Sequence, residues 1–264
     1  MSALSIFPDI KQIPLVRKLF DVERLKDASP HSLPRKIYMY WDSGFDSAPE
    51  ICRMCVESWK RLNPTWEVVL LDKAKALEIV PEDELPEGLL PNHFANLLRM
   101  KLMVRQGGVW ADATLLCTQP LDEWLVSLFN QTDFFFFSRP GKDRLISNWF
   151  MASTPSSYVM HRIDEACDRY WDKRKRLPRN YFWHHALIQY LYLTSSRFRS
   201  DFRSLPMINA NMCHILQQSL ARGGPTSEEF ARVRATPMQK LTHKKNMTPD
   251  RMAAFIEEIE SVPS

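Results

Sequence analysis

Asp112 is a carboxylate inside an apolar stretch, residues 109–116, that directly follows two glycines. A carboxylate in apolar surroundings is costly unless it is paired with a cation or bound to a metal ion. Residue type therefore leaves two interpretations: a salt bridge within a sheet, with Arg99 as the candidate partner, or a divalent cation. Mg²⁺ and Mn²⁺ take oxygen ligands and can use a single protein carboxylate together with substrate phosphates. We take Asp112 as the candidate metal ligand and Mn²⁺ or Mg²⁺ as the expected cofactor.

Two further groups of polar residues are candidates for the same site. His184 and His185 are adjacent, and adjacent residues on a helix point about 100° apart, so one ring can face a cleft while the other packs. The sequence pattern does not show which of the two rings faces the cleft, and we take His185 as the candidate. Lys240, Thr242 and Lys244 form a basic segment suited to closing over an anionic group as a lid. The alternative for this segment is a solvated loop.

The composition indicates an ordinary globular chain. Of its 264 residues, 45% are hydrophobic and 25% charged, which is enough for one large α/β domain. Glycine is scarce, with 7 residues, and neither GxGxxG nor GxxxxGK[ST] occurs. This argues against a Rossmann dehydrogenase or a P-loop enzyme. A net charge of +4 is too small to indicate a nucleic-acid binder, so no nucleic-acid partner is expected.

The cysteines and the apolar runs bear on where the protein works. Five cysteines without a regular framework are typical of a reducing compartment. Cys52 and Cys55 have CxxC spacing, but Val56 and Trp59 continue the same apolar face, which favours core packing over metal or redox chemistry. No apolar run approaches the ~20 residues that span a bilayer, and the N-terminus does not resemble a signal peptide. We expect a cytoplasmic protein whose basic clusters, such as residues 173–176, are solvated faces or contacts with the inner membrane surface.

The elements that must position these residues alternate between strands and helices. Strands are predicted over residues 35–41, 66–72, 109–116, 133–137 and 148–152, and helices over residues 51–62, 92–106, 157–171, 181–194, 209–220 and 249–259. The β-α-β order at the start predicts parallel strands. The expected fold class is therefore α/β, a mostly parallel central sheet flanked by helices, with helical C-terminal additions.

The chain is expected to hold one domain. Residues 1–33 are predicted as an N-terminal extension with a short helix over residues 13–25. Residues 34–264 are predicted as the domain itself, with the lid segment near residues 236–246. A parallel sheet binds its ligand at the carboxyl ends of its strands. Trp41, Asp72 and Asp112 each lie at or just after such an end, and we expect them to share one cleft.

An ordered series of motifs resembles the capsular polysaccharide synthesis family of glycosyltransferases. The motifs are Arg35-Lys36-Ile37 with Trp41, Pro49 with Cys52 and Ser58-Trp59, Asn63-Pro64, Leu98-Arg99-Met100, Gly107-Gly108-Val109-Trp110-Ala111-Asp112-Ala113-Thr114, and a late segment, residues 236–244. The resemblance covers about residues 34–245. It implies a GT-A-like, Rossmann-like α/β fold, related to the DxD-type glycosyltransferases that include the clostridial glucosylating toxins.

The resemblance implies roles for the matching residues. Trp41 matches the aromatic residue that stacks on the nucleotide base, and Arg99 matches the helix arginine that contacts the donor. Asp112 matches the first acidic residue of the DxD motif, at the metal–diphosphate centre. Lys240 is expected to act with Asp112 in catalysis, by adding positive charge to the leaving diphosphate. Motifs, strand ends and the basic segment together predict a nucleotide-sugar site of Trp41, Asp72, Asn96, Arg99, Asp112, Thr114, His185, Thr242 and Lys244.

Two positions depart from the family's pattern. Thr114 stands where DxD has its second acidic residue, and Ala95-Asn96 stands where the family has Ser-Asp before the helix arginine. Asparagine can hydrogen-bond a sugar hydroxyl but brings no charge. The departures therefore bear on metal affinity and donor identity rather than on the fold.

The resemblance implies a glycosyltransferase that moves a hexose from a nucleotide diphosphate sugar, UDP-linked, to a hydroxyl of a surface glycan or lipid-linked saccharide. It further implies metal assistance and retention of anomeric configuration. Two other classes stay open. One is a catalytically silent relative that binds sugar nucleotides or partner enzymes as a scaffold, which Thr114 and Asn96 favour. The other is a nucleotidyltransferase, which normally carries a basic glycine-rich N-terminal loop that this sequence lacks.

Overall fold

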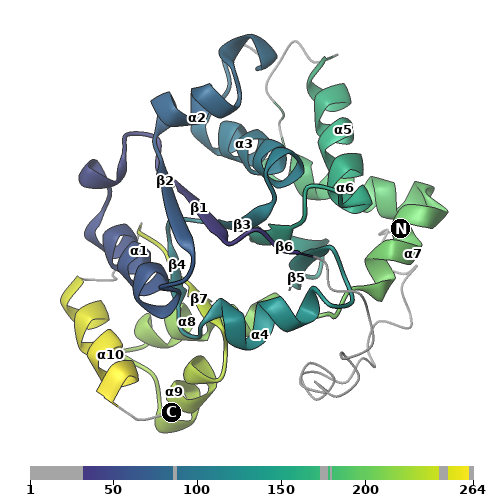
Figure 1. Cartoon of the computed structure of the whole chain (residues 1–264). Helices are drawn as coiled ribbons and strands as arrows, with labels where there is room; N and C mark the ends of the chain where they lie inside the picture. The colour runs from purple at the N-terminus through teal and green to yellow at the C-terminus, as the bar shows by residue number, and fades with distance from the viewer. Residues whose placement is uncertain (1–31, 86–87, 173–177, 179, 244–248, 262–264) are drawn as a thin grey trace.

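The computed structural model describes residues 32–85, 88–172, 178, 180–243 and 249–261. A five-stranded sheet in the order β2-β1-β3-β6-β5 forms its centre (Figure 1). Its strands are β1 (Lys36–Tyr40), β2 (Glu67–Leu71), β3 (Gly108–Ala111), β5 (Phe134–Gly141) and β6 (Arg144–Ser153). A second, two-stranded sheet pairs β4 (Leu115–Cys117) with β7 (Met238–Lys240).

The strand directions match the predicted sheet. β1 pairs in parallel with β2 and with β3, whereas β6 is antiparallel to both β3 and β5. Of these five strands, four therefore run the same way and β6 alone is reversed. The prediction of an α/β fold with a mostly parallel central sheet is confirmed, and the carboxyl ends of β1 and β3 lie side by side.

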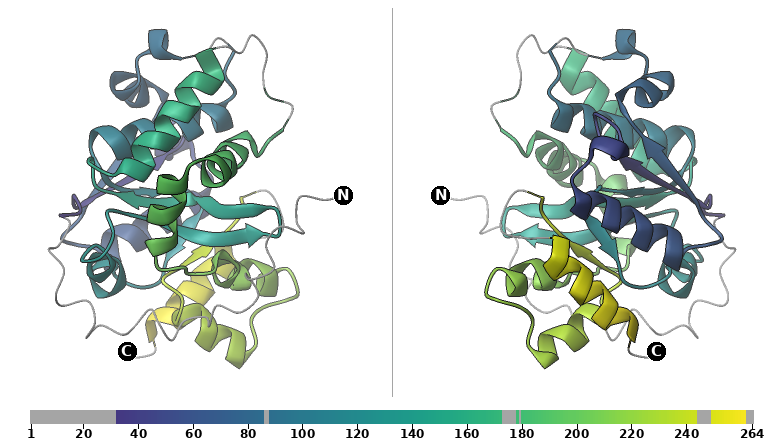
Figure 2. Two further views of the ribbon diagram at one scale, coloured as in Figure 1. Left: turned by 90° about the vertical axis from the view of Figure 1, so that its right-hand side faces the viewer. Right: turned by 90° about the vertical axis from the view of Figure 1, so that its left-hand side faces the viewer.

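Helices cover both faces of the central sheet. They are α1 (Glu50–Leu62), α2 (Lys73–Ile79), α3 (Pro91–Arg105), α4 (Leu121–Leu128), α5 (Tyr158–Asp172), α6 (Trp183–Thr194), α7 (Ser196–Ser204), α8 (Ile215–Leu220), α9 (Ser227–Arg234) and α10 (Pro249–Ser261), with 3₁₀ turns at Phe45–Ser47, Glu82–Glu84 and Ala210–His214. Figures 1 and 2 show α2, α3 and α5 on one side of the sheet, and α1, α4 and α10 on the other. None of the helices in the described part of the chain is long and apolar enough to cross a membrane.

Two glycines place β3 against its neighbour. Gly107 and Gly108 both have positive φ, 68° and 93°, a region that residues with a Cβ rarely adopt. A Cβ on Gly108 would lie 2.7 Å from the carbonyl oxygen of Lys36, in β1. The pair therefore ends α3 with a tight turn and lets β3 approach β1 closely. Asp112 then follows the carboxyl end of β3, the central strand of the sheet.

The prediction of one strand over residues 109–116 is wrong. β3 ends at Ala111, and the chain turns at residues 112–114, where the amide of Leu115 donates to the carbonyl of Asp112 at 2.9 Å. β4 then leaves the central sheet and pairs with β7. Residues on both sides of the turn are buried and apolar, so the sequence pattern carries no sign of the bend. Asp112 keeps one backbone hydrogen bond to β6, in which its amide donates to the carbonyl of Trp149 at 2.9 Å, and its side chain is 27% exposed.

Some of the remaining predicted helices and strands are present in the structure and others are not. The other predicted strands are present, as are the helices that correspond to α1, α3, α5, α6 and α10, whereas the predicted helix over residues 209–220 is a 3₁₀ turn followed by α8. α2, α4, α7, α9 and β7 are elements that the sequence analysis did not predict. The predicted helix over residues 13–25 lies outside the described residues, as does the basic cluster at residues 173–176.

Candidate active site

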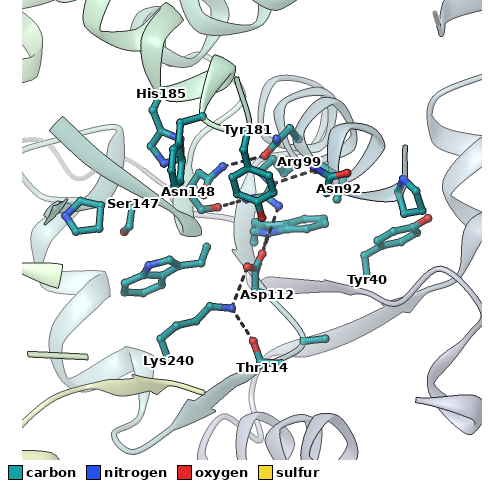
Figure 3. Close-up of a pocket in the computed structure, with 18 of the residues that line it drawn as sticks. Tyr40, Asn92, Arg99, Asp112, Thr114, Ser147, Asn148, Tyr181, His185 and Lys240 are labelled. Carbon is teal, nitrogen blue, oxygen red and sulfur yellow. Dashed lines mark hydrogen bonds and ion pairs between the residues drawn. The ribbon is translucent and has the colours of Figure 1, made fainter. Parts of the chain in front are cut away.

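A cleft of ≈ 630 Å³ lies at the carboxyl ends of β1 and β3. Its volume is in the range of pockets that hold small molecules and cofactors. Figure 3 shows Asp112 at its centre, with Lys240 and Thr114 on one side and Arg99, Asn148 and Tyr181 on the other. Seven of the residues predicted from sequence line it: Trp41, Asn96, Arg99, Asp112, Thr114, His185 and Lys240.

Three donors surround the carboxylate of Asp112. Its Oδ1 accepts from the indole Nε1 of Trp110 at 2.9 Å and lies 3.3 Å from the guanidinium of Arg99. Its Oδ2 lies 3.1 Å from the ammonium of Lys240, which also donates to Oγ1 of Thr114 at 2.6 Å. Both interpretations of Asp112 required a positively charged partner. The expected salt bridge with Arg99 is present, and Lys240 forms a second one.

The electrostatics of Asp112 follow from these contacts. Burial alone would raise the pKa of this carboxyl, but the ammonium of Lys240 and the guanidinium of Arg99 outweigh it and hold the pKa below its usual value. Asp112 is therefore ionised at neutral pH. One negative and two positive side chains leave the centre of the cleft with a net positive charge, which favours an anionic ligand.

Arg99 is held rigidly by α3 and β6. Its Nε donates to the carbonyl of Ala95 at 3.0 Å, its Nη1 donates to the backbone carbonyl of Asn148, and its guanidinium lies 4.8 Å from the centre of the Trp110 ring. The side-chain amide of Asn148 also donates to Oδ1 of Asn96 at 2.8 Å. Asn148 was not among the predicted site residues. It lies inside a predicted strand, and nothing in the neighbouring sequence indicates that its side chain faces a cleft.

Lys240 is fixed on a strand rather than on a lid. β7 pairs with β4 in a register that sets Lys240 opposite Leu115, and Met238, Gln239 and Leu241 are buried. The interpretation of residues 236–241 as a lid or a solvated loop is therefore wrong, because the backbone of residues 238–240 completes a sheet and most of the side chains are buried. Lys244 and the two residues after it in the predicted lid lie outside the described residues.

Trp41 and His243 frame one end of the cleft. Trp41 follows β1, is half-buried and packs against Ala48, Cys52 and Ala113. Its ring meets that of His243 edge to face, with centroids 5.2 Å apart. Both rings line the cleft, which places an aromatic surface where a flat ligand could stack.

The two adjacent histidines lie in different surroundings, as the helical geometry predicted. His184 is completely buried, and neither of its ring nitrogens has a hydrogen-bond partner among the described residues. His185 lines the cleft, and burial together with the charges of Arg144 and Arg99 lowers the pKa of its ring to about 4. His185 is therefore a neutral imidazole at neutral pH.

Tyr181, Phe182 and Arg144 form the other end of the cleft, and the sequence analysis assigned none of them to it. The guanidinium of Arg144 lies 4.2 Å from the centre of the Phe182 ring. Tyr181 is 66% exposed and reaches over the cleft toward Arg99 and Asp112 (Figure 3). This end presents aromatic and cationic groups to solvent.

Two predicted site residues do not line the cleft. Asp72 is the N-cap of α2, and its Oδ1 accepts from the amide of Lys75 at 2.8 Å. This cap satisfies an otherwise unpaired helix amide, so a structural role accounts for the residue type. Thr242 follows β7 and is half-buried beside the cleft rather than in it.

The donor set for a metal ion is small. Asp42, the other carboxylate lining the cleft, accepts from the hydroxyl of Tyr40 at 2.6 Å. Within the described ranges, no three His, Cys, Asp or Glu side chains are grouped so as to hold a metal ion. Both oxygens of Asp112 and the hydroxyl of Thr114 are already engaged by cations or donors. A divalent ion does not fit beside Asp112 while Lys240 occupies this position.

The sequence model of the capsular polysaccharide synthesis proteins matches residues 15–259 of the chain. O-glycosyltransferase PaGT of Phomopsis amygdali is 26% identical over 156 residues, covering 50% of this chain and 38% of that protein. O-glycosyltransferase braB of Annulohypoxylon truncatum is 24% identical over 217 residues, covering 72% of this chain and 51% of that protein. The chain thus spans about half the length of these relatives or less.

Among solved structures, a glycosyltransferase involved in the glycosylation of the major capsid of PBCV-1 superposes with a TM-score of 0.47. It is 10% identical, and the match covers 86% of this chain and 98% of that one. This likeness is too weak to carry an inference about the site.

Proposed function

Because the chain belongs to the capsular polysaccharide synthesis protein family, we propose that it is a glycosyltransferase whose active site is the cleft around Asp112. The observation that carries the proposal is the charge arrangement at the strand ends. One ionised carboxylate is held between Lys240 and Arg99, in a cleft of ≈ 630 Å³ with a net positive centre. A nucleotide sugar brings the matching anionic diphosphate and a base that can stack.

The proposed donor is a nucleotide diphosphate sugar, with UDP as the nucleotide and a hexose as the sugar. Trp41 would stack on the base, at the end of the cleft that it shares with His243. Arg99 and Lys240 would contact the diphosphate, and the amides of Asn96 and Asn148 would hydrogen-bond sugar hydroxyls. This order places the base beside β1 and the sugar beside β6.

In the transfer step, the bond between the anomeric carbon and the diphosphate oxygen breaks, and its electron pair leaves with the diphosphate. The acceptor hydroxyl oxygen forms the new bond to the anomeric carbon, and its proton passes to the departing diphosphate or to water. Negative charge grows on the leaving oxygen, so a fixed cation beside it stabilises the transition state more than the ground state. Retention of configuration stays a prediction from the family resemblance. Assistance by Mn²⁺ or Mg²⁺ is also implied by that resemblance alone, and the contacts of Lys240 with Asp112 and Thr114 do not favour it.

The acceptor would enter over Tyr181 and Phe182. An exposed aromatic ring offers a face to a saccharide, and Arg144 adds a cation for an acceptor that carries a phosphate. A saccharide or lipid-linked saccharide of a surface glycan is the proposed acceptor, met in the cytoplasm or at the inner face of the membrane.

Thermal-shift measurements with a panel of nucleotide sugars test the donor. A ligand that binds only the folded protein raises its melting temperature according to its concentration and affinity. A shift with UDP-sugars, followed by release of UDP when a saccharide acceptor is added, would support the proposal. Binding without any transfer or donor hydrolysis would favour the scaffold alternative instead. No shift with any nucleotide sugar would refute the proposed donor class.

A further inference from the structure

Lys240 occupies a fixed position in the cleft. Its backbone ends β7, opposite Leu115 in β4, and the amide of Leu241 donates to the carbonyl of Thr114 at 2.8 Å. Gln239, next to it, is completely buried; its side chain accepts from the amide of Leu216 at 3.0 Å. These contacts hold the strand on both sides, so the backbone that carries the lysine side chain is held in place.

The ammonium bridges the two polar residues of the Asp112–Thr114 turn. It lies 3.1 Å from Oδ2 of Asp112 and 2.6 Å from Oγ1 of Thr114. These are the two side chains of the turn that offer oxygen atoms to the cleft, and a metal ion bound at the turn would take its ligands from them. The lysine side chain is only 20% exposed, and a buried ammonium is stable only where such oxygens compensate its charge.

The local charges disfavour a further cation. The carboxylate of Asp112 is balanced by Lys240, and Arg99 adds a second positive charge 3.3 Å from Oδ1. A divalent ion at this carboxylate would meet two like charges within a few ångströms and find no second carboxylate on the turn, because its third residue is Thr114. The same charges favour binding of a diphosphate, because its negative charge is complementary to the net positive centre of the cleft.

We propose that the Lys240 ammonium is the resident cation of this site, held by Asp112 and Thr114 where a divalent ion would bind, so that the diphosphate is bound and released without a metal. This inference rests on the proposed glycosyltransferase function. An ammonium has three N–H donors. Two point to Asp112 and Thr114, and the third is left for a diphosphate oxygen. Asp112 then acts on the diphosphate through Lys240, by positioning its ammonium.

Calorimetric titration of the full chain tests the proposal, with UDP as the probe, in EDTA and in Mn²⁺. Wild type should bind UDP with the same affinity in both solutions. Lys240→Met should bind UDP about 10- to 100-fold more weakly in EDTA, the range for losing a hydrogen bond to a charged group. Mn²⁺ should then restore much of that affinity, because the variant frees Oδ2 of Asp112 for an ion. UDP binding by wild type that requires Mn²⁺ would overturn the proposal.

The controls separate the possible failures. Lys60→Met removes an exposed lysine that pairs with Glu57 at 2.8 Å, outside the cleft, and should bind UDP as wild type does. Lys240→Gln removes the charge but keeps a polar side chain, and it is the second variant if Lys240→Met does not fold. No UDP binding by wild type in either solution would refute the proposed donor. A titration with Mn²⁺ alone then decides the further inference, since Mn²⁺ bound by wild type and lost in Asp112→Asn would overturn it.

Discussion

The guanidinium of Arg99 lies 3.3 Å from the carboxylate of Asp112 and 4.8 Å from the centre of the Trp110 ring, so one arginine links the carboxylate, the strand before it and helix α3. The arrangement keeps Asp112 ionised and aimed into the cleft. It also makes the carboxylate part of the packing of the site, which means that its removal has both a structural and a chemical effect.

The first prediction concerns Asp112→Asn. The amide conserves the volume but leaves Arg99 and Lys240 without their shared counter-charge, so we expect transfer to fall by more than ~100-fold, as when a preorganised electrostatic group is removed from an active site. We expect the free energy of unfolding to fall by roughly 1–3 kcal/mol, the cost of leaving buried polar groups unpaired. Turnover with a UDP-sugar and urea denaturation measure the two effects.

Asp122→Asn is the matched control for Asp112→Asn. Asp122 also pairs with an arginine, Arg35 at 2.9 Å, and accepts from an indole, Trp66 Nε1 at 3.1 Å, but it lies on α4 outside the cleft. We expect this variant to keep its activity. Equal losses of activity in the two variants would mean that the effect at Asp112 is general destabilisation rather than chemistry in the cleft.

A second prediction places Trp41 against the nucleotide base. Trp41→Ala should weaken binding of UDP and of a UDP-sugar alike, by about 1–3 kcal/mol, the range for aromatic–base stacking. Trp41→Phe keeps a flat ring and should retain most of the affinity. Isothermal titration of both ligands gives the comparison. An effect on the UDP-sugar alone would place Trp41 beside the sugar instead of the base.

The elements around this site differ in how far sequence could predict them. β1, α1, β2 and α3 were predicted because their apolar spacing is regular and proline or glycine marks their ends. β7 has three residues, too few for a period of two to be recognised, and its partner β4 lies more than a hundred residues earlier. The pairing of Lys240 with Asp112 spans 128 residues and depends on that strand pairing. Local patterns predicted the residue types of the site, whereas its long-range contacts required the fold.

The third prediction concerns stability at acidic pH. Burial, followed by repulsion from the His185 ring when it is protonated and from Arg99, lowers the pKa of His184 well below its usual value. Burial and the charges of Arg144 and Arg99 lower the pKa of His185 to about 4. In the unfolded chain both rings bind a proton near pH 6.5, so the unfolded state gains protons first as the pH falls. Their contribution to stability is complete above about pH 6.5 and is lost as the pH falls toward the folded pKa values. Each ring adds a slope of up to about 1.4 kcal/mol per pH unit in that window.

Urea denaturation between about pH 7.5 and pH 5 measures this dependence. His184→Leu removes one buried titrating ring and should make the loss of stability with falling pH less steep. A slope that is the same in wild type and in His184→Leu would show that His184 is not responsible for the acid sensitivity.

The last prediction concerns β7, which the basic sequence of its C-terminal end suggested to be a lid. Thr236, Met238, Gln239 and Leu241 are at most 2% exposed, and strand pairing with β4 protects the backbone. Since protection from hydrogen exchange follows burial and stable hydrogen bonds, the amides of Gln239 and Leu241, which face β4, should exchange slowly without any nucleotide. Gln239→Ala would leave the buried amide of Leu216 without its acceptor and should speed exchange across β7, at a cost of about 1–3 kcal/mol in stability. Fast exchange of the Gln239 and Leu241 amides that slows only when UDP is added would instead restore the lid and contradict the rigid placement of Lys240 on β7.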